Sequence, residues 1–413
     1  PTIANANLAK LDGGSGNDTL YTEESGSNTT ELILNDTFGA TNWENLIGTD
    51  GNETIKGDGN NNILGGNKGN DTLYGYGGDD TLYGNADRHD GVYMEDENDT
   101  GNNTLYGGAG NDTLVGGYYV DTLDGGTGTD TLTGGSGIDT FIIRTGDGST
   151  TLANANVITD FADGTDIIGM DGLNFNELTI EQGTGDYENH TLVSVTATGE
   201  YLLIIQNTTA SDITVSSFSN LSTDAQTFNG TSGNDTFVGG SGNDTFNGGA
   251  GSDELYGHAG DDTFNITDKS GAYTDIVDGG SGNDTLDIDY TGVENLGSFA
   301  FTYDSATSTY TLTDANGGVI NYKDIETLTI GNYTYTQVTY DGEPEQAYWN
   351  SSEKVLYLYN SGTSGASLQQ EIWIPGEPSA LDGLAKTDDI TVQGSAGDDS
   401  FNLNVNRETE YSG

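Results

Sequence analysis

A single large apolar residue returns every nine positions along two stretches of the chain, in surroundings of Gly, Asp, Asn and Thr. The apolar position is held in the first stretch by Leu114, Leu123, Leu132 and Phe141, and in the second by Phe237, Phe246, Leu255 and Phe264. The polar residues between them favour tight turns. The pattern therefore predicts a series of short strands, each with one side chain directed inward.

The full repeated unit is Gly-Gly-x-Gly-x-Asp-x-U-x, where U is the apolar residue. Unbroken series run over 107–142 and 230–265, and single copies stand at 13–21, 75–83, 279–287 and 394–402. One inward residue per nine cannot bury a useful core within one repeat. Two repeats per coil, stacked at the strand spacing of about 4.8 Å, would bury a continuous one. We therefore predict an all-β fold of parallel β-rolls (β-solenoids) that alternate with β-rich cap and sandwich-like domains.

The repeat also carries candidate metal chemistry. Its sixth residue is a carboxylate, and its glycines let the backbone turn tightly and direct carbonyl groups at one point. Such oxygens suit Ca²⁺, which takes about six to eight oxygen ligands. Cysteine is absent and only 3 histidines occur, so zinc, copper and iron are poor candidates. The predicted calcium ligands are Asp18, Asp71, Asp80, Asp112, Asp121, Asp130, Asp139, Asp235, Asp244, Asp253, Asp262, Asp284 and Asp399, with Gly107, Gly125, Gly134, Gly239 and Gly248.

Stacking with two repeats per coil places loops two repeats apart above one another, with the ion between them. This geometry pairs Asp112 with Asp130, Asp121 with Asp139, Asp235 with Asp253, and Asp244 with Asp262. Turn residues alone could also mark a flexible linker, but a linker has no reason to keep an apolar residue in register.

Several repeats depart from the pattern. Glu53, Asn62 and Asn103 replace the Asp, and Tyr119 replaces a glycine. We therefore expect fewer ions than repeats.

Composition points the same way. The chain has 66 acidic and 10 basic residues, a formal net charge of -56, and 32% hydrophobic residues. Such a chain repels itself unless cations neutralise part of its charge, so we hypothesise that folding is coupled to calcium binding. The acidic balance argues against nucleic acid as a partner. No apolar run of about 18 residues occurs, so we expect no membrane span.

The repeat resembles the hemolysin-type calcium-binding nonapeptide of the RTX family, and Val157–Asp166 resembles the segment that closes the repeat array in secreted RTX proteins. The resemblance implies a large bacterial protein exported by the type I route to the cell surface or beyond. Loops of this open kind suit the weak calcium affinities of extracellular modules, with Kd of about 10⁻⁴ to 10⁻³ M. An extracellular or cell-surface location is therefore expected.

The loss and return of the nine-residue period divides the chain. We expect a partial repeat and β segment at 1–47, a first β-roll at 48–142, a β-rich cap at 143–227, a second β-roll at 228–289, a β-rich non-repeat domain at 290–393, and the start of a further repeat array at 394–413. A cap is needed because the open end of a parallel solenoid is an edge that invites aggregation.

Catalytic signatures are missing from the sequence. It contains no Gly-x-Ser-x-Gly elbow and no His-Glu-x-x-His helix, and its histidines, His89, His190 and His258, are far apart. We expect no enzyme activity. The RTX repeat itself serves toxins, lipases, proteases, adhesins and surface-layer proteins alike, so it does not name a function.

Three hypotheses about function follow. The first is a structural module of a surface layer or fibre that self-associates into a filament or layer on calcium binding. The second is an adhesin that binds glycans or a receptor through the aromatic residues Tyr348, Trp349, Tyr357, Tyr359 and Trp373. The third is the non-catalytic C-terminal part of a secreted enzyme or toxin. The alternative, favoured because strand residues at period two usually direct their rings inward on one face, is that those aromatic residues form the core of the 290–393 domain.

Overall fold

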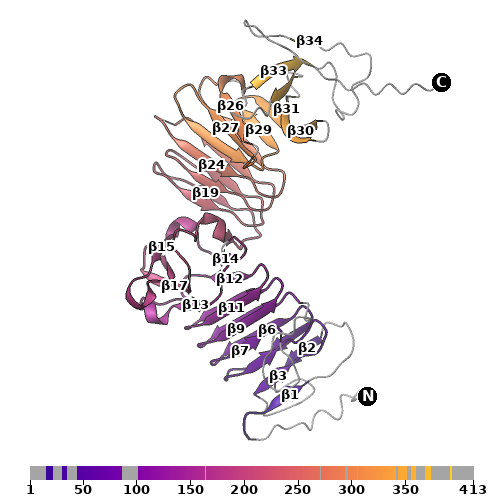
Figure 1. The fold of residues 1–413 in the computed structure, drawn as a ribbon, viewed down its shortest axis with the longest axis vertical. Coiled ribbons are helices and arrows are strands. Elements are labelled where there is room, and N and C mark those ends of the chain that lie inside the picture. The colour runs from indigo at the N-terminus through magenta and orange to yellow at the C-terminus, as the bar shows by residue number, and fades with distance from the viewer. Residues whose placement is uncertain are drawn as a thin grey trace, which may run out of the picture. The chain divides into compact units, whose positions relative to one another are not determined.

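The computed structural model describes residues 15–21, 30–34, 44–85, 101–162, 164–269, 271–293, 296–304, 306–340, 343–350, 355–359, 368–373 and 391–392. The chain divides into two compact units, Pro1–Ala225 with Thr236–Gly242 and Gln226–Asp235 with Asn243–Gly413. Within the described residues the elements are β-strands and short 3₁₀ turns, and no α-helix occurs. The predicted all-β class is confirmed (Figure 1).

The first unit is a β-roll of two parallel sheets. Alternate strands along the chain join alternate sheets, so each coil contributes one strand to each sheet. One sheet has the order β1 (Thr19–Tyr21), β3 (Asn45–Ile47), β5 (Ile63–Gly65), β7 (Thr81–Tyr83), β9 (Thr113–Tyr118), β11 (Thr131–Ser136), β13 (Asn156–Ile158), β17 (Glu200–Ile205), β16 (Thr191–Val195) and β15 (Leu178–Gln182). The other has the order β18 (Phe218–Asn220), β14 (Ile167–Met170), β12 (Thr140–Ile143), β10 (Thr122–Thr127), β8 (Thr104–Ala109), β6 (Thr72–Gly77), β4 (Glu53–Lys56) and β2 (Thr30–Ile33).

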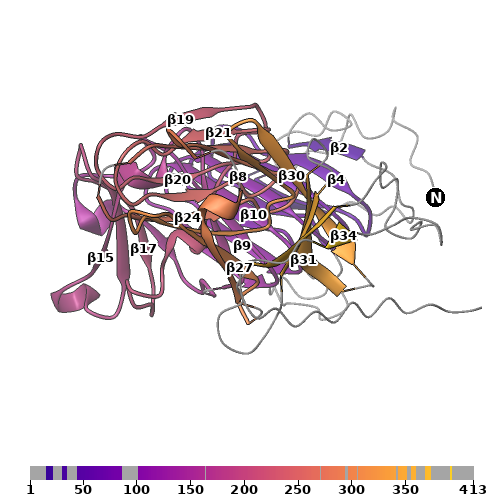
Figure 2. The same cartoon turned by 90° about the horizontal axis from the view of Figure 1, so that it is seen from above.

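The register of the first roll is two repeats per coil, as the sequence predicts. Leu114 pairs with Leu132 in one sheet, and Leu123 pairs with Phe141 in the other. All four side chains are at most 1% exposed and belong to one core cluster. Figure 1 shows these strands side by side, and Figure 2 views the same coils from above. The thin core is therefore a continuous row of the apolar residues that set the period.

The expected boundaries of the first roll do not coincide with breaks in its sheets. Strands β2 and β3, from the 1–47 segment, pair in parallel with the roll strands β4 and β5, and β1 pairs in parallel with β3. In the 143–227 cap, β13, β14, β17 and β18 also continue the two sheets in parallel. The β15–β16 and β16–β17 pairs are antiparallel. The period of the sequence therefore ends before the stacking does.

The second unit repeats this architecture. One sheet has the order β19 (Thr227–Asn229), β21 (Thr245–Asn247), β23 (Thr263–Thr267), β25 (Thr285–Asp289), β29 (Thr327–Ile330), β30 (Tyr333–Tyr340), β31 (Glu343–Asn350), β32 (Val355–Tyr359), β33 (Leu368–Trp373) and β34 (Thr391–Val392). The other sheet runs through β22 (Glu254–Tyr256), β24 (Thr274–Asp278), β28 (Val319–Lys323), β27 (Thr309–Thr313) and β26 (Ala300–Asp304). Strand β20 (Thr236–Val238) lies in the first unit.

Stacked aromatic rings form one row of the core of the second roll. Phe228, Phe246 and Phe264 occupy the same register position in β19, β21 and β23, and successive rings stack with centroids 4.8 Å apart. This distance equals the usual spacing of neighbouring strands, about 4.8 Å, so the rings repeat with the coils. Beyond the last nonapeptide, β28 and β29 still pair in parallel with β24 and β25, so the roll extends into the 290–393 segment.

Candidate metal-binding loops

The sixth-position aspartates of the first roll form two ladders of hydrogen bonds. In each step, one carboxylate oxygen accepts the backbone N–H of the residue at the same position one coil earlier. Asp112 N–H donates to Asp130 Oδ1 at 2.8 Å, and Asp121 N–H donates to Asp139 Oδ1 at 2.9 Å. Asp80 N–H donates to Asp112 Oδ1 at 2.7 Å. The ladder holds successive loops in line, as the predicted pairing requires.

The second roll carries the same ladders. Asp235 N–H donates to Asp253 Oδ1 at 3.1 Å, and Asp244 N–H donates to Asp262 Oδ1 at 2.7 Å. Asp262 N–H in turn donates to Asp284 Oδ1 at 2.8 Å. The four aspartate pairs expected from the sequence therefore lie in the expected register, while calcium ligation by each residue stays a prediction.

The other oxygen of many of these carboxylates has no protein partner. In the described part of the chain, Oδ2 is buried without a hydrogen-bond partner in Asp18, Asp80, Asp112, Asp130, Asp262 and Asp284. An isolated buried carboxylate oxygen is costly unless a cation or a donor satisfies it. The orphaned oxygens therefore indicate where a cation would bind.

The first glycine of each repeat leaves the space beside this oxygen. A Cβ atom at Gly107 would lie 2.5 Å from Asp112 Oδ2 and 2.6 Å from the carbonyl oxygen of Gly125. At Gly125 and Gly134 it would lie 2.4 Å from Oδ2 of the same repeat's Asp, and at Gly248 the distance is 2.7 Å. A carboxylate oxygen and a backbone carbonyl thus face one small space, and this is a donor set that fits Ca²⁺.

Burial controls the charge state of the ladder in the metal-free protein. Burial raises the pKa of Asp80, Asp130 and Asp262 to about 7, with neighbouring carboxylates adding to the shift. The ladder hydrogen bonds oppose this shift in each case. A nearby cation favours the ionised form of a carboxylate, so binding would lower these pKa values and release protons.

The described residues contain no cluster of three or more His, Cys, Asp or Glu side chains able to hold a metal. The loops instead bring together carboxylate oxygens and turn carbonyl oxygens, such as Asp112 Oδ2 and the Gly125 carbonyl. Ca²⁺ accepts both kinds of oxygen.

The degenerate repeats keep the ladder but change its chemistry. Asn103 Oδ1 accepts the Asp71 N–H at 3.0 Å, while its Nδ2 donates to Asn85 Oδ1 at 2.7 Å. An amide NH₂ therefore stands where Asp would place a second oxygen. Tyr119, in a glycine position, keeps the turn with a φ of 77°. The loop of this repeat is therefore formed despite the lost glycine.

Residues outside the nonapeptide complete the ladders. Asn156 Oδ1 accepts the Asp130 N–H at 2.8 Å, and Asp166 Oδ1 accepts the Asp139 N–H at 3.1 Å. In the second roll, Glu326 Oε2 accepts the Asp284 N–H at 2.7 Å and Asp275 Oδ1 accepts the Asp253 N–H at 3.0 Å. None of these residues follows a complete Gly-Gly-x-Gly run, so that motif does not identify them. A carboxylate or amide two places before a buried apolar residue would have found them.

In the segment that resembles an array-closing sequence, Asp160 contacts the last nonapeptide of the first array. Its two carboxylate oxygens accept the N–H groups of Gly134 and Gly135 at 3.0 and 2.8 Å. The carbonyl of the predicted ligand Gly239 accepts a hydrogen bond from the Asn220 N–H at 3.1 Å.

Asp399 and the expected array at 394–413 lie outside the described residues, as do the side chains of the aromatic group from Tyr348 to Trp373. None of the helices in the described residues has the length and hydrophobicity of a membrane span.

Comparison with known proteins supports the repeat assignment. The family of RTX calcium-binding nonapeptide repeats matches residues 10–25, 38–71, 57–88, 99–117, 110–141, 229–264 and 270–287. No curated protein sequence matches the chain. Among solved structures, the crystal structure of the extracellular lipase LipA from Serratia marcescens is similar at 15% sequence identity, with a TM-score of 0.16. The match covers 71% of this chain and 40% of the lipase chain, and at that TM-score it carries no argument here.

Proposed function

We propose that this chain, which carries RTX calcium-binding nonapeptide repeats, is a calcium-loaded structural module of a secreted extracellular protein, without catalytic activity of its own. The observation that carries the proposal is the ladder of buried aspartates whose second oxygens face the glycine turns unpaired. A row of like charges inside a narrow roll is stable only when cations neutralise it.

Calcium would supply positive charge between successive loops. Asp112 Oδ2 and the Gly125 carbonyl are the kind of oxygens that would hold it, while the Oδ1 atoms keep the loops in register. Extracellular calcium, at about the millimolar level where weak modular sites fill, would load the rolls outside the cell. The roll would then fold where it works and stay largely unfolded during export.

We further propose that the chain self-associates into a filament or layer. Its support is the chain's series of two rolls without a catalytic motif. An adhesin module would use the same rolls as a rigid carrier, with a glycan or receptor as its ligand.

The test is light scattering and negative-stain microscopy of the purified chain at a free calcium concentration a few times the expected Kd of about 10⁻³ M. The same measurements are repeated in excess chelator. Filaments or sheets that dissolve on chelation support the structural module. A monomer that folds in calcium and does not assemble refutes self-association and leaves the calcium-loaded module. An unchanged far-UV circular dichroism spectrum in chelator would contradict calcium-dependent folding itself.

A further inference from the structure

An insertion in the second roll lengthens two ladder steps, Asp253 to Asp275 and Asp262 to Asp284, to 22 residues each. Asp253 and Asp275 are 22 residues apart, whereas Asp235 and Asp253 are 18 apart, although both steps keep the N–H to Oδ1 hydrogen bond. The extra residues are Ile266–Lys269, which follow the last residue of the preceding repeat. The five places before Asp275 read Ser-Gly-Ala-Tyr-Thr instead of Gly-Gly-x-Gly-x. The turn has therefore lost most of its glycines and gained a lysine.

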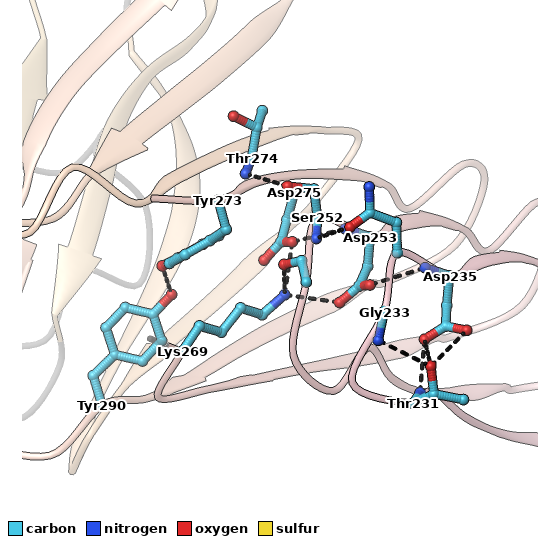
Figure 3. A network of polar contacts seen from close by, with 12 residues as sticks. Thr231, Gly233, Asp235, Ser252, Asp253, Lys269, Tyr273, Thr274, Asp275 and Tyr290 are labelled. Carbon is cyan, nitrogen blue, oxygen red and sulfur yellow. Dashed lines mark hydrogen bonds and ion pairs between the residues drawn. The ribbon is translucent and has the colours of Figure 1, made fainter. Parts of the chain in front are cut away.

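That lysine is buried inside the ladder. The Lys269 side chain is 1% exposed, and its Nζ lies 2.8 Å from Asp253 Oδ2 and 2.7 Å from Asp275 Oδ1. Nζ also donates to the carbonyl oxygen of Gly251 at 3.1 Å. An ammonium group has three N–H donors, and here each has an oxygen acceptor. Figure 3 shows the side chain reaching between Asp253 and Asp275.

The surroundings hold the lysine in this position. Nζ lies 5.0 Å from the ring centroid of Tyr273, within the range of a cation–π contact. Tyr273 stands where the third glycine of the repeat belongs, is 6% exposed, and hydrogen-bonds through its hydroxyl to the Tyr290 hydroxyl. The same hydroxyl lies 3.3 Å from Asp314 Oδ2. The aromatic ring therefore covers the ammonium where other loops have only a turn.

The oxygens around Lys269 are of the same kind as those of the neighbouring loops. Two carboxylates from successive coils and one turn carbonyl surround Nζ. In the adjacent ladder, Asp262 and Asp284 keep an Oδ2 atom that is buried without a partner. At Asp253, the ammonium takes the place beside Oδ2 that a cation would take elsewhere, whereas Asp275 binds the ammonium through Oδ1 and keeps its Oδ2 buried without a partner.

We propose that the Lys269 ammonium is a built-in cation that replaces Ca²⁺ between the 248–253 turn and Asp275. This step of the second roll binds no calcium and stays joined when calcium is removed. The inference rests on the proposed calcium-loaded roll and adds that one of its ion positions is filled by the chain itself. Because the ammonium is tethered, its contacts with Asp253 and Asp275 do not depend on the calcium concentration.

The first experiment counts calcium ions bound by the full chain. Lys269→Ala removes the ammonium and leaves two carboxylates and a carbonyl around a space, so native mass spectrometry at saturating calcium should show one more bound ion than in the wild type. The matched control is Lys323→Ala, because Lys323 is 43% exposed and pairs with Asp278 in the same unit. Its ion count should equal that of the wild type. An equal count for Lys269→Ala and the wild type, with both folded by circular dichroism, overturns the proposal.

A second measurement uses the unmodified chain and does not depend on the variant folding. In saturating calcium, an amine-reactive acetylating reagent should modify Lys323 readily and leave Lys269 protected, as read by peptide mass spectrometry. Acetylation of Lys269 at the rate of Lys323 would mean that calcium has displaced the ammonium, and the inference would be wrong. A wild-type chain that binds no calcium would instead refute the proposed function, so the two failures are distinguishable.

Discussion

The substitution Asp112→Asn separates the two roles of the ladder carboxylate. Asn keeps an Oδ1 that can accept the Asp80 N–H, now bonded at 2.7 Å, but it carries no charge on the side of Oδ2. The chain already contains this replacement at Asn103, whose Oδ1 accepts the Asp71 N–H. The variant should therefore keep the register of the coils and change only the demand for a cation.

The magnitude follows from the pKa of Asp112. Burial raises it from 3.8 to about 6 in the metal-free protein, and the side chain is only 1% exposed. Because the folded pKa is raised, the folded metal-free roll favours the protonated form. Ionising Asp112 therefore destabilises the folded metal-free state. This destabilisation is absent below the unfolded pKa of 3.8, and it is complete above about pH 6. There it reaches roughly 3 kcal/mol, at about 1.4 kcal/mol per pKa unit, and Asn removes it.

Calcium reverses the sign of the effect. A filled site stabilises the folded state by about 2.7 kcal/mol when free calcium is about a hundred times Kd. Asp112→Asn removes a charged ligand and loses much of that stabilisation. The variant should therefore be more stable than the wild type in chelator at neutral pH and less stable than the wild type in saturating calcium.

Two titrations followed by far-UV circular dichroism measure this inversion. In chelator, the variant should keep its strand signal to a higher pH than the wild type on a titration from about pH 4 to about pH 8. At neutral pH, the variant should need more calcium to fold. Asp186→Asn removes the same charge from an exposed site and controls for net charge. A variant that unfolds in chelator at a lower pH than the wild type would refute the reasoning.

Three further predictions concern the coils, each measured by urea unfolding in saturating calcium. Gly128→Ala places a Cβ 1.6 Å from the Gly110 carbonyl oxygen and should lower the free energy of unfolding by about 3 kcal/mol or more. Its control, Gly146→Ala, is also at positive φ but has open space around it, and should lower the free energy of unfolding by only about 1 to 2 kcal/mol. Equal losses would contradict this. Tyr119→Gly relieves a residue at φ 77° and should stabilise the roll by about 1 kcal/mol, so a lower urea midpoint would count against the strain. Leu123→Ala empties a fully buried position and should cost about 2 to 5 kcal/mol, and a change below about 1 kcal/mol would show that the core does not depend on it.

The register of the strands could be predicted from the sequence because the nine-residue period and the burial of the apolar residue are coupled. Stacking with two repeats per coil buries the single inward residue of each repeat and places Leu114 beside Leu132 in one sheet. The same register fixes the aspartate pairs. The ends of the rolls could not be predicted in this way. Asn156 and Glu326 reach the same ladder positions without glycines before them, since the stacked coil dictates where their oxygens lie. Lys269 could not be placed at all, because an insertion has no register of its own.

The ladder separates geometry from charge, and this determines where the rolls need calcium. Each described step uses one side-chain oxygen to hold the preceding loop, and Asp, Asn and Glu all supply it. What differs is the second atom: an unpaired oxygen at Asp112, an amide at Asn103, and an oxygen bound by an ammonium at Asp253. A step of the first kind requires a cation, whereas steps of the second and third kinds do not. Single residues therefore determine how strongly each step of a roll depends on calcium. Chelation should separate neighbouring coils at the steps with an unpaired Asp oxygen, while the coils at the Asn103 and Lys269 steps stay joined.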